Sequence, residues 1–187
     1  MPLNLAVVTV STRPGRKGPL VAEWFAAHAR EHGKFDAAAI DLADFALPVF
    51  DEPEHPMKGI YHHEHTKRWS AAIAPADAVA FVMPEYNHGP SPAFTNAVNY
   101  LHREWQYKPV GFVTYAGVSG GTRAALMAKP LMVTVKAMPI PEAVAIPAFF
   151  EHLGPNGFEP KEPHRNSATQ MLDELAKWAG ALKPLRG

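Results

Sequence analysis

Apolar and polar positions follow one another along the chain in blocks that predict an alternation of strands and helices. Short apolar runs of strand length predict five strands over residues 4–10, 35–42, 77–83, 108–115 and 142–146. Longer segments with apolar residues at helical spacing predict helices over residues 19–30, 62–72, 92–103, 124–137 and 167–182. Ser167 is the predicted N-cap of the last helix. This strand–helix repeat predicts one parallel sheet with helices on both of its faces.

A stiff polar turn follows the third predicted strand, in the segment from Met83 to Pro90. Its prolines restrict the backbone, and Gly89 permits a conformation that other residues resist. Because ligands bind at the carboxyl ends of strands in open parallel sheets, this turn is a candidate ligand loop. Exposed main-chain amides on a stiff loop suit a flat ring with polar edges. The plainer alternative is an ordinary loop before a helix.

A second candidate loop, residues 11–18, joins the first predicted strand to the first predicted helix. The start of a helix offers unpaired N–H groups and a positive dipole end, which suit a phosphate. Ser11 contributes a hydroxyl, and Arg13, Arg16 and Lys17 contribute positive charge. The loop has neither a Walker A sequence nor the Gly-x-Gly-x-x-Gly of a dinucleotide site. A solvated basic turn is the alternative interpretation.

The sequence Pro-Glu-Tyr-Asn at residues 84–87 closely resembles the flavin-binding loop of the NADPH-dependent FMN reductase family. Residues 11–18 resemble that family's phosphate-binding loop, usually Gly-Ser-x-Arg, although Val10 stands where the glycine is common. The resemblance covers most of the chain and implies a single flavodoxin-like domain over residues 1–187. The implied architecture is a three-layer α/β/α sandwich whose five-stranded parallel sheet has the order 2-1-3-4-5. In that order strands one and three are neighbours at the switch point, where FMN binds.

The resemblance also implies a cofactor and a reaction. Bound FMN would be reduced by NADPH or NADH and would pass electrons to a small-molecule acceptor, such as a flavin, a quinone, an azo compound or a metal oxyanion. The cofactor supplies this chemistry, so no catalytic side chain is assigned. The implied phosphate-binding residues are Ser11, Arg13, Arg16, Gly18 and Leu20. The resemblance places the loop Pro84, Glu85, Tyr86 and Asn87 at the pyrimidine edge of the flavin ring, which it would contact through main-chain amides. It places Gly117, Ser119 and Gly120 on the other side of the flavin ring.

Three alternatives to such an enzyme are compatible with the sequence. The first is a flavodoxin-like electron carrier that binds FMN without efficient direct oxidation of NAD(P)H. The second is a reductase that uses FMN as a released substrate rather than as a bound cofactor. The third is a flavin-free relative of the fold with a structural or regulatory role. Binding of FMN and its rate of reduction by NAD(P)H distinguish these classes.

The charge balance and the absence of cysteine limit the kinds of partner and chemistry that are expected of the protein. The chain has 187 residues, and its 18 Lys plus Arg balance its 18 Asp plus Glu. This balance argues against nucleic acid as the main partner and against an acidic carrier that is steered to basic proteins. The absence of cysteine excludes disulfides and thiol catalysis. The apolar run at residues 3–10 is too short to span a bilayer, so a cytoplasmic protein with no membrane partner is expected.

Four histidines, His55, His62, His63 and His65, invite comparison with a metal site. On the predicted helix, however, the adjacent His62 and His63 would point to different faces. Zinc requires a fixed ligand geometry, so no metal ligand is assigned. A solvated or interface-facing cluster is the preferred interpretation of these histidines.

The sequence also predicts self-association. Residues 43–58, Trp69 and the pair Phe149–Phe150 give more apolar surface than one small sheet covers. The family resemblance implies dimers or tetramers in which a neighbouring copy helps to close the flavin pocket. A homodimer or homotetramer is therefore expected.

Overall fold

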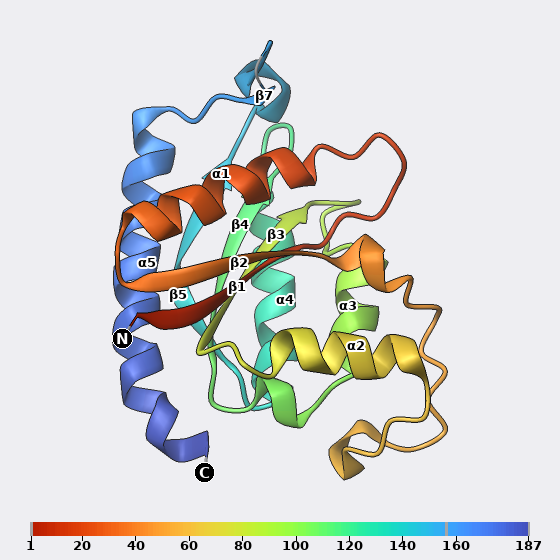
Figure 1. Ribbon diagram of the computed structural model, residues 1–187. Coiled ribbons are helices and arrows are strands. Elements are labelled where there is room, and N and C mark those ends of the chain that lie inside the picture. Colours follow the sequence, from red (N-terminus) through yellow and green to blue (C-terminus); the bar gives the residue numbers. More distant parts are fainter. Residues whose placement is uncertain (1, 156, 187) are drawn as a thin grey trace.

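The computed structural model describes residues 2–155 and 157–186. It contains the predicted five-stranded parallel sheet, with the strand order β2-β1-β3-β4-β5 (Figure 1). The strands are β1 (Leu3–Thr9), β2 (Phe35–Asp41), β3 (Ala78–Pro84), β4 (Pro109–Tyr115) and β5 (Met138–Ile146). Every residue of β3 and β4 is buried, as expected for strands that are covered on both sheet faces. β1 and β3 are paired neighbours, so their carboxyl ends meet at the switch point of the sheet.

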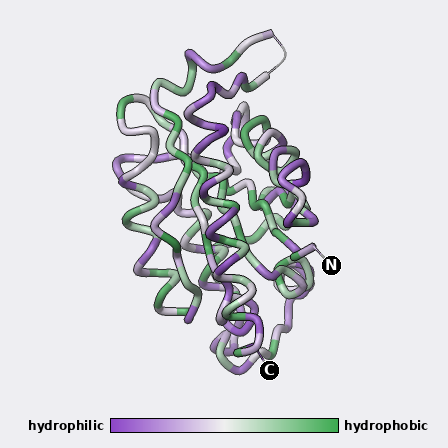
Figure 2. Tube along the Cα trace, turned by 90° about the vertical axis from the view of Figure 1, so that its left-hand side faces the viewer, coloured by the Kyte–Doolittle hydropathy of each residue, from purple (hydrophilic) through white to green (hydrophobic). Residues whose placement is uncertain are grey.

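Helices cover both faces of the sheet and divide the core into two apolar clusters (Figure 1). One face carries α1 (Gly18–Glu31) and α5 (Glu162–Leu182), and the other carries α2 (Glu64–Ile73), α3 (Pro92–Asn99) and α4 (Thr122–Thr134). Hydrophobic and hydrophilic positions alternate along the outer helices, as expected of helices that bury one side (Figure 2). The predicted three-layer sandwich is therefore confirmed. None of the helices in the described residues has both the length and the apolarity that crossing a membrane requires.

Aromatic side chains fill the cluster between the sheet and helices α2 to α4. The ring of Phe81 on β3 packs against Phe94 and Phe112, with centroid distances of 5.0 and 6.0 Å. Trp69 is fully buried, and its indole N–H donates to the Ala97 carbonyl at 2.9 Å. The prediction that Trp69 contributes to an exposed interface is therefore wrong, because this side chain joins α2 to α3 inside the core.

The starts of β5 and α5 lie earlier in the chain than predicted. β5 begins at Met138 rather than at residue 142, and it accommodates two prolines because it is an edge strand. α5 begins at Glu162, with Pro163 in its first turn. Ser167 therefore lies inside the helix, and its assignment as the N-cap is wrong.

Short elements that the sequence did not indicate occupy the long connections. The segment between β2 and α2 contains 3-10 turns at Leu42–Phe45 and Pro56–Lys58, and Arg103–Trp105 forms another before β4. After β5, a 3-10 turn at Phe149–His152 leads into a hairpin of β6 (Leu153–Gly154) and β7 (Gly157–Phe158). A last turn, Lys183–Arg186, follows α5. The turn after β5 matters for function because it borders the cavity described next.

Candidate functional site

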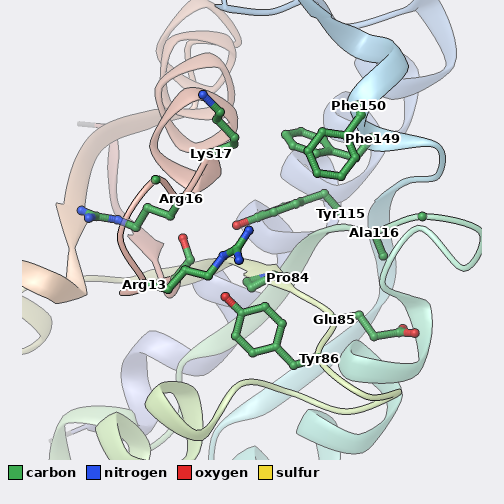
Figure 3. Close-up of a pocket in the computed structure, with 13 residues that line it drawn as sticks. Arg13, Arg16, Lys17, Pro84, Glu85, Tyr86, Tyr115, Ala116, Phe149 and Phe150 are labelled. Atoms are coloured by element: carbon green, nitrogen blue, oxygen red, sulfur yellow. The ribbon is translucent and has the colours of Figure 1, made fainter.

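A cavity of about 240 Å³ lies at the carboxyl ends of β1, β3 and β4 (Figure 3). Its lining residues are Ser11, Arg13, Gly15, Arg16, Lys17, Pro84, Glu85, Tyr86, Tyr115, Ala116, Gly117, Phe149 and Phe150. Of the twelve residues that the sequence assigned to FMN, the cavity brings together Ser11, Arg13, Arg16, Pro84, Glu85, Tyr86 and Gly117. It does not bring Gly18, Leu20, Asn87, Ser119 or Gly120 into its lining. Four segments that are far apart in the sequence, the loops after β1, β3 and β4 and the turn after β5, thus meet at one edge of the sheet.

The first loop ends at an open helix N-terminus. Lys17 is the N-cap residue of α1, and its side chain forms no capping hydrogen bond within the described residues. Ser11 is buried, and its hydroxyl oxygen has no hydrogen-bond partner in the part of the chain that the structure covers. A Cβ atom at Gly18 would lie 2.4 Å from that oxygen and 2.7 Å from the Tyr115 hydroxyl oxygen. Unpaired donors around a position that only glycine fits form a suitable cradle for an anion.

The cations of the first loop differ in their availability. Arg13 extends into the cavity toward the Tyr115 hydroxyl (Figure 3). Arg16 forms an ion pair with Asp41 at the end of β2, and its guanidinium points away from Tyr115 (Figure 3). Because this pairing offsets the charge of Arg16, Arg13 is the cation that an anion beside Tyr115 would meet, while the Lys17 amine points away from Arg13 (Figure 3).

The loop after β3 closes in a tight turn. Tyr86 and Gly89 exchange backbone hydrogen bonds of 3.0 and 2.9 Å, and Asn87 and His88 have φ of 49° and 67°. Positive φ at both central residues is typical of a type I′ turn. The unusual backbone thus belongs to Asn87 and His88, and the expectation that Gly89 supplies it is wrong. The Tyr86 N–H donates a hydrogen bond inside the turn, and the Tyr86 side chain lines the cavity. The Glu85 carboxylate accepts hydrogen bonds from backbone N–H groups of α4.

The glycine-rich loop after β4 has two distinct parts. Gly117 lines the cavity, so this part of the loop lies where the sequence assigned it. The Ser119 hydroxyl oxygen instead accepts the Gly121 N–H at 3.2 Å, and the Gly120 carbonyl accepts the Thr114 hydroxyl at 2.9 Å. Gly120 also has a φ of 62°, which favours glycine. Ser119 and Gly120 therefore shape the turn that leads into α4 instead of lining the cavity.

Sequence reasoning missed the aromatic wall of the cavity. The rings of Tyr115 and Phe149 lie 4.8 Å apart, and Phe150 beside them is 72% exposed. Burial raises the pKa of Tyr115 to about 12, so its hydroxyl stays protonated at neutral pH. Tyr115 could have been found, because it is the last residue of a strand whose end faces the ligand edge. The two phenylalanines lie on a 3-10 turn that has no clear sequence signature.

The histidines belong to a different region and do not line this cavity. α2 begins two residues later than predicted, so His62 precedes the helix and His63 occupies its N-cap position. The rings of His63 and His65 stack at 5.2 Å, and His65 Nε2 lies 3.0 Å from an Asp51 carboxylate oxygen. That oxygen also accepts the Tyr100 hydroxyl at 2.8 Å, which ties the β2–α2 connection to α3. Within residues 2–155 and 157–186, no three His, Cys, Asp or Glu side chains are grouped as a metal site requires.

Known proteins share this sequence pattern and this fold. The chain matches the family model described as NADPH-dependent FMN reductase over residues 3–151. An NAD(P)H-dependent FMN reductase of Schizosaccharomyces pombe is 39% identical over 120 residues, which cover 63% of this chain and 60% of that protein. Another from a Nectria species is 39% identical over 152 residues, 77% of this chain and 75% of that protein. The solved structure of the flavoenzyme NAD(P)H:(acceptor) oxidoreductase FerB from Paracoccus denitrificans has a TM-score of 0.77 at 22% identity, covering 96% of this chain and 98% of that one.

The sheet order and the cavity at its switch point define a flavodoxin-like protein with a ligand site at the carboxyl edge. This chain belongs to the NADPH-dependent FMN reductase family, which confirms the resemblance drawn from residues 84–87 and 11–18. The family name gives FMN as the cofactor and NAD(P)H as the electron donor of these flavoenzymes. The likeness to the FerB structure, at its lower identity, supports the fold alone.

The residues of the cavity fit FMN. The unpaired Ser11 hydroxyl, the open N-terminus of α1 and the Arg13 side chain are suitable donors for a phosphate. The Tyr115 and Phe149 rings, which are tilted by 42° to each other, offer an apolar wall for an aromatic ring system. A cavity with a polar end and an apolar end matches a ligand that carries a phosphate on one side and a planar ring on the other.

Proposed function

We propose that this protein is an FMN-dependent NAD(P)H oxidoreductase that passes electrons through bound FMN to a small acceptor. The observation that carries the proposal is the buried, unpaired Ser11 hydroxyl beside the open N-terminus of α1, at one end of a cavity with an aromatic wall. FMN held in this cavity would supply the redox chemistry of hydride transfer from a nicotinamide. A quinone, an azo compound, a metal oxyanion or a free flavin is compatible as the acceptor.

The protein contributes position and electrostatics to this reaction. Ser11, Arg13 and the backbone N–H of Gly18, the first residue of α1 beside the Ser11 hydroxyl, would hold the phosphate. The loop around Tyr86 and the loop at Gly117, which both line the cavity, would hold the ring system. Holding the ring between fixed loops orients one of its faces toward the donor and the acceptor.

An absorption spectrum of the purified protein, before and after anaerobic addition of NADPH or NADH, tests this proposal. Bound FMN gives a yellow protein whose flavin band bleaches rapidly with at least one donor. A colourless protein that turns over added FMN would instead identify FMN as a released substrate. Bleaching too slow for turnover with either donor would favour an electron carrier, and failure to bind FMN would indicate a flavin-free relative.

We expect ping-pong kinetics for this enzyme. The chain has no second nucleotide motif of the Gly-x-Gly-x-x-Gly or Walker A type, so donor and acceptor would use one exposed ring face in turn. Double-reciprocal plots against NAD(P)H at several quinone concentrations should then be parallel. Excess quinone should also inhibit competitively against NAD(P)H. Intersecting lines would show that donor and acceptor bind together and would contradict a single shared face.

Exposed apolar side chains on α4 support self-association as part of the proposal. Leu126, Met127 and Val133 on this helix are 65%, 61% and 59% exposed. Beside them, a groove of about 440 Å³ is lined by Phe50 and Met57 from the β2–α2 connection together with residues of α3 and α4. Apolar surface of this extent usually marks an interface, and a second copy of the chain is the occupant that the family resemblance implies.

Replacing Leu126 with aspartate is expected to disrupt the self-association of the protein. A charge at the centre of an apolar interface loses its hydration without gaining a partner. Leu126 is exposed in the single chain, so the substitution should leave the fold intact. Light scattering at micromolar concentration should give at least twice the monomer mass for the wild type and a lower mass for Leu126→Asp. Leu185→Asp, at another exposed leucine outside α4, is the matched control and should leave the mass unchanged. A wild-type protein of monomer mass would contradict the proposed assembly.

A further inference from the structure

Helix α4 lacks an N-terminal cap from its own segment. Gly121 is its N-cap residue, with a φ of 86°, and within the described residues no side chain of the N-cap position bonds to the first turn. The cap comes from another loop. A carboxylate oxygen of Glu85, which follows β3, accepts the backbone N–H groups of Arg123 and Ala124 at 3.1 and 3.4 Å. A carboxylate at this position satisfies unpaired amides and complements the positive end of the helix dipole.

The Glu85 carboxylate is a fixed and nearly buried negative charge. Its side chain is 5% exposed, and its second oxygen lies 3.3 Å from a guanidinium nitrogen of Arg123. Burial acts to raise the pKa of Glu85, but hydrogen bonds from Ser119, from the Ala124 and Arg123 amides and from the Arg123 side chain outweigh it and lower the pKa. The residue is therefore ionised at neutral pH. Arg123 is 52% exposed and partly offsets this charge from the solvent side.

This contact joins two walls of the cofactor cavity. Glu85 lies between Pro84 and Tyr86, and all three line the cavity. Its partners on α4 come directly after the loop that carries Gly117, which also lines the cavity. This carboxylate is thus one link between the two loops, beside the Glu85 N–H, which donates to the Tyr115 carbonyl at 3.4 Å. Figure 3 shows this carboxylate pointing away from the Arg13 side of the cavity, so it holds the wall in place without occupying the space inside.

We propose that Glu85 is a positioning residue that fixes the spacing of the two ring-binding loops, and that the Glu85–Arg123 pair sets the reduction potential of the bound cofactor. This inference rests on the proposed FMN-dependent function. Uptake of a hydride adds one negative charge to a bound cofactor. An anion in the cavity wall opposes that charge and lowers the midpoint potential, whereas a cation beside it raises the potential.

The sign of this effect separates an electrostatic role from a structural one. Glu85→Gln removes the anion and keeps the size of the side chain, so the midpoint potential of bound FMN should become more positive. Arg123→Gln removes the cation at an exposed position, so the potential should become more negative. Because Glu85→Gln also weakens the link between the loops, it should raise the dissociation constant for FMN by about tenfold. If the two substitutions acted only by loosening the loops, the midpoint potentials of Glu85→Gln and Arg123→Gln would shift in the same direction.

The test is a redox titration of FMN-loaded wild type and variants against a reference dye. Glu64→Gln is the control, because it removes a carboxylate in the first turn of α2 that does not line the cavity. It should change neither the potential nor the affinity. Shifts of equal sign, or no shift in either variant, would overturn the inference. If Glu85→Gln does not fold, Arg123→Gln still tests the proposal. An unchanged or more positive midpoint potential of FMN bound to Arg123→Gln contradicts it. A wild type that binds no FMN would instead refute the proposed function itself.

Discussion

Replacing Arg13 with alanine is expected to weaken FMN binding by about ten- to a hundredfold and to leave the fold intact. The guanidinium extends into the cavity, while its exposed position means that no core packing is lost. A charge-assisted hydrogen bond to a phosphate contributes roughly 1.5–3 kcal/mol, which corresponds to this change in affinity. Fluorescence titration of apoprotein with FMN measures the dissociation constant, and thermal unfolding checks the fold.

Two comparisons make this result specific. Riboflavin lacks the phosphate, so its affinity should be nearly the same in wild type and in Arg13→Ala. Arg16→Ala is the matched substitution on the same loop, and its effect on FMN should be smaller, because Arg16 is already paired with Asp41. Equal weakening of FMN and riboflavin by Arg13→Ala would show that the loop is not a phosphate site.

The sheet could be predicted from the sequence because the local pattern of apolar residues agrees with the fold that buries those residues. β3 and β4 are continuous apolar runs, which require helices on both faces, and each is followed by turn residues and a helical period. The start of α5 could not be predicted in the same way. His164 Nδ1 accepts the Lys161 N–H at 3.1 Å, so a histidine replaces the glutamate that usually identifies a capping box.

The candidate site could be predicted only as far as residue type indicates binding chemistry. Hydroxyl, arginine and glycine residues after β1, and the loop after β3, carry such signals, and they meet in one cavity. The pairing of Arg16 with Asp41 depends on tertiary contacts that no local pattern encodes. The same holds for the carboxylate of Glu85, whose partners on α4 are about forty residues away in the chain. The sequence therefore predicts which loops form the site, but it does not predict which side chains pair with one another across those loops.

Replacing Gly18 with alanine is expected to reduce FMN affinity by about a hundredfold, the largest effect of any single methyl group in this site. The added Cβ would lie 2.4 Å from the Ser11 hydroxyl oxygen and 2.7 Å from the Tyr115 hydroxyl oxygen, with Thr9 Cγ2 at 3.3 Å. All three neighbours are buried, so relief of the overlap requires a shift of the Ser11 and Tyr115 hydroxyl groups, and both of these residues line the cavity. Overpacking of this kind costs about 1–3 kcal/mol of stability, and the displaced Ser11 hydroxyl would no longer face the phosphate.

A second substitution tests the cause of this loss. Tyr115→Phe removes one of the two hydroxyl groups that the new methyl meets, so the double variant should bind FMN more tightly than Gly18→Ala alone. A double-mutant cycle should then give a coupling energy, because the two side chains share one space. Gly180→Ala is the control: nothing lies within 4 Å of its added Cβ, and in the interior of α5 it should stabilise the protein by about 0.5–1 kcal/mol without changing FMN affinity. Wild-type FMN affinity in Gly18→Ala would show that the phosphate is bound elsewhere than at the start of α1.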